Sequence, residues 1–109
     1  DSEGGPNHAR NFCEAPIMCN LEKGTYEKRL SYYYIWHFSR FIAPGAVQVA
    51  TTVFSEEVGA AAFCNPDGTI VVVLLNQSAA AHRVFLRLTG GLIELLLEGD
   101  SICTVEIQQ

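Results

Sequence analysis

The stretch 58–77, VGAAAFCNPDGTIVVVLLNQ, predicts a β-hairpin and constrains the fold of this chain more than any other. Two apolar runs flank the turn residues 65–68, NPDG, where proline presets the backbone, asparagine and aspartate can bond their own main chain, and glycine accepts a positive φ. The second arm, 69–75, is a nearly unbroken run of β-branched residues and leucine without polar alternation. Such a strand has both faces covered by protein, so we expect it to be central in its sheet.

Other short strands surround this hairpin, separated by turn signals. The predicted strands are 47–54, 59–64, 69–76, 83–88, 92–97 and 101–108. In 83–88, arginines alternate with apolar side chains, which indicates a strand that is wet on one face. Short strands with closely spaced turns are typical of an antiparallel β-sandwich, so the fold class is mostly β.

One helix is predicted before these strands, over 26–42, with Thr25 as its N-cap and an end at Ala43-Pro44-Gly45. Its surface is apolar all round, which predicts burial on more than one side. His37 lies on its aromatic stripe, and we expect a packed, hydrogen-bonded histidine there. Upstream, 1–11 has the composition of a loop, 15–19 that of an extended piece and 22–24 that of a surface turn.

Length, charge and hydropathy exclude several function classes. The 109 residues suffice for one domain core with little room for an independent second one. The formal net charge is −5 and the seven Lys and Arg residues are scattered, so no basic footprint for nucleic acid exists. No apolar run approaches the roughly 20 residues of a membrane span. Because the chain starts at Asp1 and its one methionine is Met18, we expect a fragment or a processed product.

The chemistry-bearing residues do not form a recognisable site of their own. The four cysteines lack metal-ligand spacing, so we expect no metal site; they could pair as two disulfides in three ways, but buried free thiols are favoured. The sequon at 76–78 closes a strand predicted to be buried, which argues against a glycan. Retaining sugar hydrolysis needs two facing carboxylates, and no such pair can be nominated, because the acidic residues at 56–57 and 98–100 lie in turns and should be solvated.

Three segments carry a resemblance to a known family. They are GGPNHARNF at 4–12, APIMCNLEKGTYEKRLSYYYIWHFSRFIAPGA at 15–46, and NPDGTIVVVLLNQS at 65–78. In this order and spacing the chain resembles the C-terminal end of glycoside hydrolase family 30, in its glucosylceramidase (acid β-glucosidase) branch. The family has the loop GGPNWxRNF, a helix ending in YxxGHFSKFIxPG and the hairpin HPDGxxVVVxxNxS at the corresponding places. The match covers essentially the whole chain, and the loop and helix motifs are specific as a pair.

The resemblance implies an antiparallel β-sandwich preceded by the last loop and helix of a (β/α)8 barrel. Residues 1–45 would be the barrel part and 46–109 the sandwich. The parent protein would be a retaining β-glucosidase, secreted or lysosomal, that hydrolyses β-glucosides such as glucosylceramide without a metal or an organic cofactor. Its two catalytic glutamates lie on earlier barrel strands, so this chain should be inactive alone. Its partners would be the remainder of the barrel and a β-glucoside or glycolipid substrate.

The resemblance also implies a small set of site residues. Asn11 would hydrogen-bond a sugar hydroxyl, Phe12 would shape the pocket rim, and Arg10 would brace the loop; for Asn11 the alternative is a loop asparagine that bonds its own backbone. Two departures from the family pattern bear on this site. His8 replaces a tryptophan and Trp36 replaces a glycine, which can change the pocket rim and the helix packing.

Two alternatives to the family function are kept. A non-catalytic β-sandwich module could bind carbohydrate or a protein partner, but it would need an exposed aromatic platform, and most aromatic residues fall within 26–41, before the sandwich. A truncated remnant without a function of its own would expose the apolar helix, which would then drive association.

Overall fold

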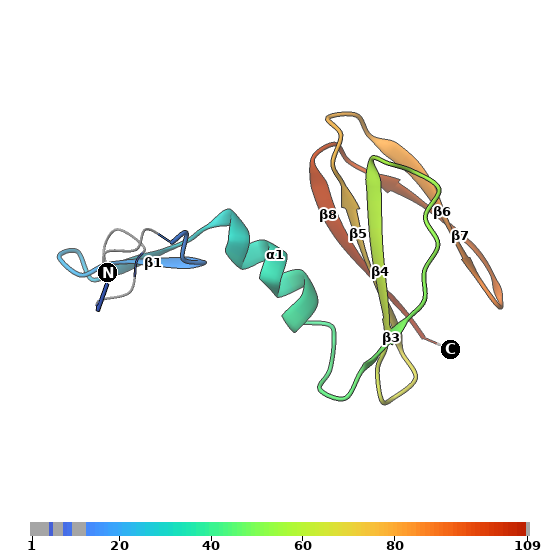
Figure 1. The fold of residues 1–109 in the computed structure, drawn as a ribbon, viewed down its shortest axis with the longest axis horizontal. Helices are drawn as coiled ribbons and strands as arrows, with labels where there is room; N and C mark the ends of the chain where they lie inside the picture. Colours follow the sequence, from blue (N-terminus) through green and yellow to red (C-terminus); the bar gives the residue numbers. More distant parts are fainter. Residues whose placement is uncertain (1–4, 6–7, 10–12, 109) are drawn as a thin grey trace. The chain divides into compact units, whose positions relative to one another are not determined.

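The computed structural model describes residues 5, 8–9 and 13–108 of the chain. Contacts divide the chain into two compact units, residues 1–36 and 37–109, and each is described by itself. Within these residues, two strands, one helix and six further strands follow one another along the chain. Figure 1 shows the fold coloured along the sequence. All strand pairs are antiparallel, which confirms the mostly β fold class.

The first unit contains a short hairpin and most of the helix. Strands β1 (Ile17–Asn20) and β2 (Thr25–Lys28) pair antiparallel. Gly24 takes a φ of 61° in the connecting turn, and the N–H of Lys23 donates to Oδ1 of Asn20 at 3.0 Å. The predicted extended piece and the turn after it are therefore confirmed.

The helix, α1 (Leu30–Ser39), begins later than predicted. Thr25 lies in β2, so its prediction as an N-cap is wrong. Pairing with β1 keeps the backbone extended up to Arg29, whose N–H donates to the carbonyl oxygen of Pro16 at 2.9 Å. The cross-strand hydrogen bonds thus override the helical spacing of the side chains in this segment.

The end of α1 agrees better with the sequence. The N–H of Ile42 still donates to the carbonyl oxygen of Phe38 at 3.0 Å, and the chain turns away before Pro44.

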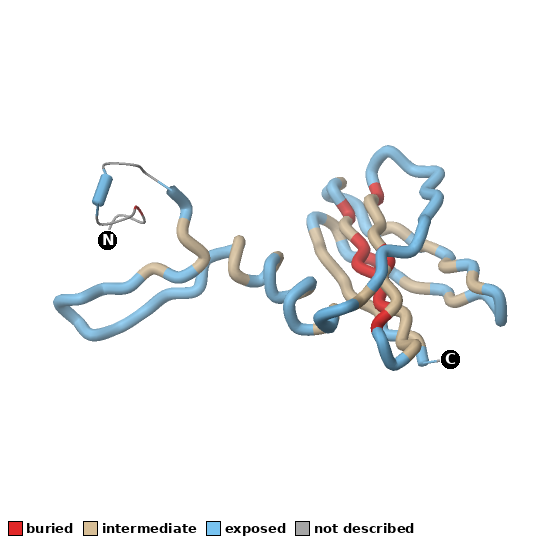
Figure 2. The backbone as a smooth tube through the Cα atoms, turned by 60° about the horizontal axis from the view of Figure 1, so that its bottom comes forward, coloured by how far each residue is buried: buried red, intermediate tan, exposed pale blue. Residues whose placement is uncertain are grey.

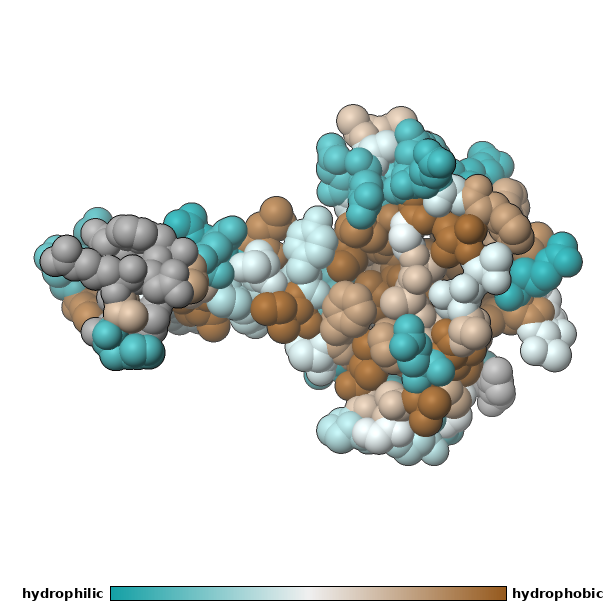
Figure 3. Space-filling view, viewed as in Figure 1, coloured by the Kyte–Doolittle hydropathy of each residue, from teal (hydrophilic) through white to brown (hydrophobic). Residues whose placement is uncertain are grey.

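No side chain of α1 is buried, so the predicted burial on more than one side is not found within the described residues. Apolar side chains of the helix, such as Leu30 and Ile35, are exposed instead, and Figure 3 shows hydrophobic residues, in brown, at the surface along α1. Among the described residues, no helix combines the length and the apolar character that crossing a membrane requires.

A four-stranded sheet is the centre of the second unit. Its order is β3 (Val47–Val49), β4 (Val58–Cys64), β5 (Ile70–Asn76) and β8 (Ser101–Ile107). Strand β5 lies between β4 and β8, and it has buried side chains on both faces, with Val71 at 0% exposure. Figure 2 shows most of the buried residues, in red, gathered within the sandwich. The prediction of a central strand covered on both sides is confirmed.

A second sheet of two strands, β6 (His82–Leu88) and β7 (Gly91–Leu97), covers one face of the larger sheet. Their side chains alternate between half-buried and exposed along β6, as the arginine alternation predicts. On the exposed face, Arg83 forms an ion pair with Glu94 at 2.8 Å. The core between the sheets consists of Val58, Ala62, Val72, Leu74 and Leu97, with Val84, Leu86, Leu95, Cys103, Val105 and Ile107 packed against them.

The turn between β4 and β5 has the predicted chemistry. Gly68 takes a φ of 88°, and its N–H donates to the carbonyl oxygen of Asn65 at 2.9 Å. Oδ1 of Asp67 accepts the N–H of Thr69 at 2.9 Å, and Thr69 in turn accepts the N–H of Asn65. This is a turn that ends in a left-handed glycine, a common connection in three-residue hairpin loops.

Strand β3 is shorter than its sequence suggests. The uncharged run 47–54 predicts a full strand, but only its first three residues pair with β4. Near the end of the unpaired segment, Oγ of Ser55 accepts the N–H groups of Glu57 and Val58 at 3.2 and 3.3 Å. This serine turn brings the chain round to the start of β4.

Candidate functional site

The three residues predicted to form the site, Asn11, Phe12 and Arg10, lie outside the described residues. Nearby, His8 and Cys13 are described and exposed. Asn11 as a sugar ligand, Phe12 as a rim residue and Arg10 as a loop brace stay predictions.

A serine, histidine and carboxylate cluster in the sandwich is not a catalytic triad. Nε2 of His82 lies 2.9 Å from Oε2 of Glu57 and 2.8 Å from Oγ of Ser78. In a triad the carboxylate and the serine hydroxyl meet opposite nitrogens of the imidazole, so that the carboxylate orients the ring while the other nitrogen takes the serine proton. Here both partners meet the same nitrogen. The cluster therefore ties the start of β4 to the start of β6, and Glu57 is not merely solvated as predicted.

The thiols and the other ligand-type side chains do not gather either. Among the described residues, no three His, Cys, Asp or Glu side chains lie close enough to hold a metal ion. All four cysteines are free thiols. Cys64 and Cys103 are half-buried, but Cys13 and Cys19 are exposed, so their predicted burial is wrong. For Cys19 the reason is that β1 and β2 form a two-stranded ribbon whose side chains are nearly all exposed.

Asn76, the asparagine of the sequon, is a buried structural residue. It is 1% exposed, and its Nδ2 donates to the carbonyl oxygens of Ala80 and Glu98 at 2.7 and 2.8 Å. Its Oδ1 accepts the N–H of Ser78 at 3.0 Å. A glycan on this amide is incompatible with the folded structure, in agreement with the predicted burial of the strand. Asn76 instead holds two loops together at one end of the sandwich.

The last residues of α1 pack on the open face of the four-stranded sheet. Nδ1 of His37 lies 2.8 Å from Oγ1 of Thr104 on β8. The rings of Phe38 and Phe63 meet edge to face, with centroids 6.3 Å apart, a favourable geometry for an aromatic pair. The prediction of His37 as a packed, hydrogen-bonded histidine is confirmed, and its partner comes from a strand far along the sequence.

A second buried asparagine, Asn65, ties the hairpin turn to the segment after α1. Its Nδ2 donates to the carbonyl oxygen of Phe41, and its Oδ1 accepts the N–H of Ala43, both at 2.9 Å. The side chain therefore does not bond its own turn, as the sequence predicted, but reaches across to another segment. The turn motif itself was visible in the sequence, whereas no local signal identified the partners of this amide.

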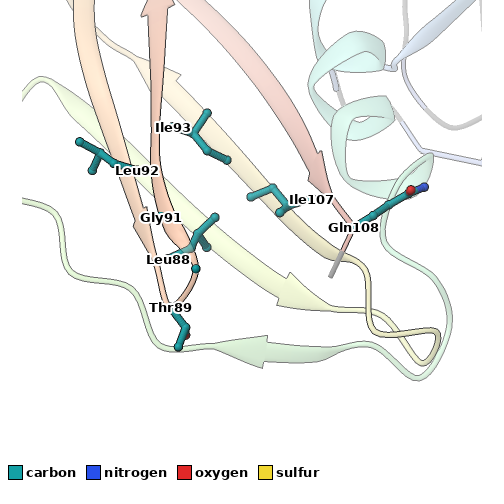
Figure 4. A pocket seen from close by; sticks show the side chains of 8 residues that line it. Leu88, Thr89, Gly91, Leu92, Ile93, Ile107 and Gln108 are labelled. Atoms are coloured by element: carbon teal, nitrogen blue, oxygen red, sulfur yellow. The ribbon is translucent and has the colours of Figure 1, made fainter.

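The described sandwich also has a hollow at one end (Figure 4). It lies between the turn of the β6–β7 hairpin and the end of β8, with a volume of about 740 Å³. Its lining consists of Leu88, Thr89, Gly90, Gly91, Leu92, Ile93, Ile107 and Gln108. No charged or aromatic side chain belongs to this lining, so it offers neither a general acid or base nor a stacking surface for a sugar.

Comparison with known families gives one match for each part of the chain. Residues 1–42 match the family described as "Glycosyl hydrolase family 30 TIM-barrel domain". Residues 45–105 match "Glycosyl hydrolase family 30 beta sandwich domain", which is more than half of the chain. The chain belongs to glycosyl hydrolase family 30. The resemblance drawn from the sequence motifs is thereby confirmed.

The family 30 relatives include glucosylceramidases and other proteins. The chain is 41% identical to lysosomal acid glucosylceramidase of Mus musculus over 106 residues, which are 94% of the chain and 20% of that protein. It is 38% identical to putative glucosylceramidase 1 of Caenorhabditis elegans, over 72% of the chain and 16% of the relative. The chain thus spans a fifth or less of the length of these curated relatives.

Solved structures give the same fold. The structure of SrfJ from Salmonella typhimurium matches with a TM-score of 0.91 and 33% identity, over 99% of this chain and 24% of that one. The endo-beta1,6-glucanase BT3312 matches with a TM-score of 0.79 and 26% identity, over 95% and 24% of the two chains.

The contacts of His37 and Asn65 lie close to the boundary between the two family 30 matches. The barrel match ends at residue 42 and the sandwich match begins at 45, yet the second compact unit begins at His37. The last residues of the barrel match therefore pack within the same unit as the sandwich. The bonds of Asn65 to Phe41 and Ala43 lie at this boundary.

Proposed function

We propose that this chain is the C-terminal segment of a retaining β-glucosidase of the glucosylceramidase type. Residues 1–45 would supply the last loop and helix of the catalytic barrel, and residues 46–109 the sandwich that supports it. The observation that carries the proposal is the succession of the two family 30 matches, barrel before sandwich, without a gap of more than two residues between 42 and 45. The glucosylceramidase relatives over most of the chain support the substrate class.

The chemistry of the parent would be that of two carboxylates. In retaining glycosidases one attacks the anomeric carbon and the other acts first as an acid and then as a base. Both would come from barrel strands that precede this chain. Asn11 would hydrogen-bond a hydroxyl of the glucoside and Phe12 would line the pocket rim, while Arg10 would hold the loop in place.

A chimeric enzyme tests this proposal. The 109-residue chain replaces the matching fifth of mouse lysosomal acid glucosylceramidase, and hydrolysis of a fluorogenic β-glucoside is measured beside the chain alone. We expect activity in the chimera and none in the chain alone. In the chimera, Asn11→Ala should lower kcat/KM by roughly 10- to 100-fold, the loss expected when a sugar hydroxyl loses its partner.

Two results would contradict the proposal. Hydrolysis by the chain alone would mean that a carboxylate of this segment is catalytic. A folded chimera without activity would mean that this segment cannot complete a family 30 barrel. The matched control is Asn20→Ala, an exposed asparagine of the β1–β2 hairpin, which should leave kcat/KM unchanged.

The hollow at the end of β8 gives no support to the alternative of a carbohydrate-binding sandwich module. Sugar-binding modules present an aromatic platform, and the hollow at the end of β8 is lined by aliphatic side chains, glycines, a threonine and a glutamine.

A further inference from the structure

We propose that Asn65 is a positioning residue, which fixes the segment after α1 on the hairpin turn of the sandwich and thereby supports the substrate-binding geometry of the parent barrel. The second half of this statement rests on the proposed function. The first half concerns contacts within the second compact unit and stands independently of any activity. No other residue of the hairpin turn has a side chain with two hydrogen bonds to the segment after the helix.

The position of Asn65 requires both a donor and an acceptor. A helix end leaves carbonyl groups and the following N–H groups without helical partners. Nδ2 of Asn65 donates to the carbonyl oxygen of Phe41, and its Oδ1 accepts the N–H of Ala43. An amide side chain can do both at once, whereas a carboxylate can only accept. Since the residue is only 8% exposed, water cannot readily replace the lost bonds.

The backbone of Asn65 makes the clamp rigid. Its N–H donates to Thr69 and its carbonyl oxygen accepts from Gly68, each at 2.9 Å, so both main-chain groups hold the hairpin turn. The side chain thus projects from a fixed base. Gly45, with a φ of 88°, also lies against this turn, because a Cβ there would meet Cγ of Pro66 at 3.5 Å.

The helix that Asn65 holds belongs to both compact units. α1 runs from Leu30 to Ser39, and the division between the units falls after Trp36. Its last residues are also fixed by the contacts of His37 with Thr104 and of Phe38 with Phe63. Whatever holds this end of the helix therefore limits the freedom of the chain between the barrel match and the sandwich match.

The chain contains a matched control for this role. Asn76 is also a buried asparagine with hydrogen bonds to backbone groups, but its partners Ser78, Ala80 and Glu98 lie at the loops of the sandwich and not beside α1. Asn65→Asp and Asn76→Asp each keep a side-chain oxygen that accepts hydrogen bonds and lose the Nδ2 amide group that donates them. Both should destabilise the sandwich, and only Asn65→Asp should loosen the helix end.

Amide hydrogen exchange of the 109-residue chain tests the clamp. We expect Asn65→Asp to accelerate exchange in residues 37–43 about tenfold or more. The reason is that a buried hydrogen bond is lost and the new carboxylate repels the carbonyl oxygen of Phe41. Asn76→Asp should accelerate exchange in 77–101 and leave 37–43 unchanged. Unchanged exchange in 37–43 for Asn65→Asp, or equal acceleration by both variants, would overturn the clamp. If Asn65→Asp does not fold, Asn65→Ser, which keeps a smaller polar group, is compared in the same way.

Kinetics of the chimera test the consequence for substrate. At a temperature where both variants are folded, Asn65→Asp should lower kcat/KM about tenfold, mainly through KM, while Asn76→Asp should change it less than twofold. Parallel losses in the two variants would assign Asn65 a merely structural role. An inactive wild-type chimera would count against the proposed function, and the exchange experiment would still decide whether Asn65 clamps the helix.

Discussion

Gly99 shows how closely single residues are packed at one end of the sandwich. It lies in the turn between β7 and β8, and a Cβ there would overlap the carbonyl group of Ala79. The turn cannot simply move away, because the N–H of the next residue, Asp100, donates to the carbonyl oxygen of Ser78 at 2.8 Å. We expect Gly99→Ala to lower the free energy of unfolding by about 1–3 kcal/mol, measured by urea denaturation.

The control for this prediction is a glycine in open space. A Cβ on Gly90 would have no atom within 4 Å, so Gly90→Ala should change stability by no more than about 0.5 kcal/mol. Equal effects of the two substitutions would contradict the close approach of the turn to Ala79.

Residue-level predictions succeeded where the cause is local and failed where it is distant. The positive φ of Gly68 and the bond of Asp67 within the turn follow from residues that are adjacent in the sequence. The partners of Asn65 and Asn76 lie up to 24 and 22 residues away. A side-chain amide carries no pattern that names a partner at such a distance, so the sequence marked both positions without revealing their role.

At the scale of an element, the β4–β5 turn predicts a pH dependence. Hydrogen bonds from the backbone and the side chain of Thr69 hold the pKa of Asp67 below its ordinary value. Because the pKa is lower in the folded state, the ionised carboxylate stabilises the turn above the unfolded pKa, and this contribution is lost as the pH falls through the folded pKa. An NMR titration should show Asp67 titrating below an ordinary aspartate. Thr69→Val removes only the hydroxyl, so it should raise the pKa partway; an unchanged pKa would contradict a role for the hydroxyl.

Element predictions were best where one pattern dominates. The run of β-branched residues identified β5 as central, because only a doubly covered strand is apolar on both faces. The helix start was wrong because β2 carries helix-compatible residues that are held extended by pairing with β1. Strand β3 pairs with β4 over three residues only, although its sequence favours a longer strand. For the helix start, a contact outside the window decided between two conformations that the local sequence allows.

At the scale of the whole molecule, the strand and turn pattern of the sequence predicted the sandwich but not the site. Alternating strands and turns were enough for the layer architecture, since they arise from burial along one short element at a time. The proposed site would combine Asn11 with two carboxylates from other strands of the parent barrel. Catalytic and binding residues that lie on distant segments produce no periodic pattern in the sequence of either segment. Only the family motifs therefore pointed to this site.

The exposed surface of α1 leads to a prediction for the chain as a whole. Leu30 is 68% and Ile35 is 54% exposed, and no side chain of the helix is buried. Exposed apolar surface of this kind favours association, so sedimentation should show a mass that rises with concentration. The double variant Leu30→Lys and Ile35→Lys should shift the chain toward monomer, because burying a charge opposes the contact.

A matched charge control separates packing from net charge. Thr52→Lys and Gln108→Lys add the same two charges at exposed positions outside the helix. Since the chain is acidic, this control lowers the mutual repulsion of its copies and should not dissolve the assembly. A monomer at every concentration, or equal effects of the two double variants, would mean that α1 is not a contact surface. Association that depends on α1 would fit a helix whose natural cover is the remainder of a family 30 barrel.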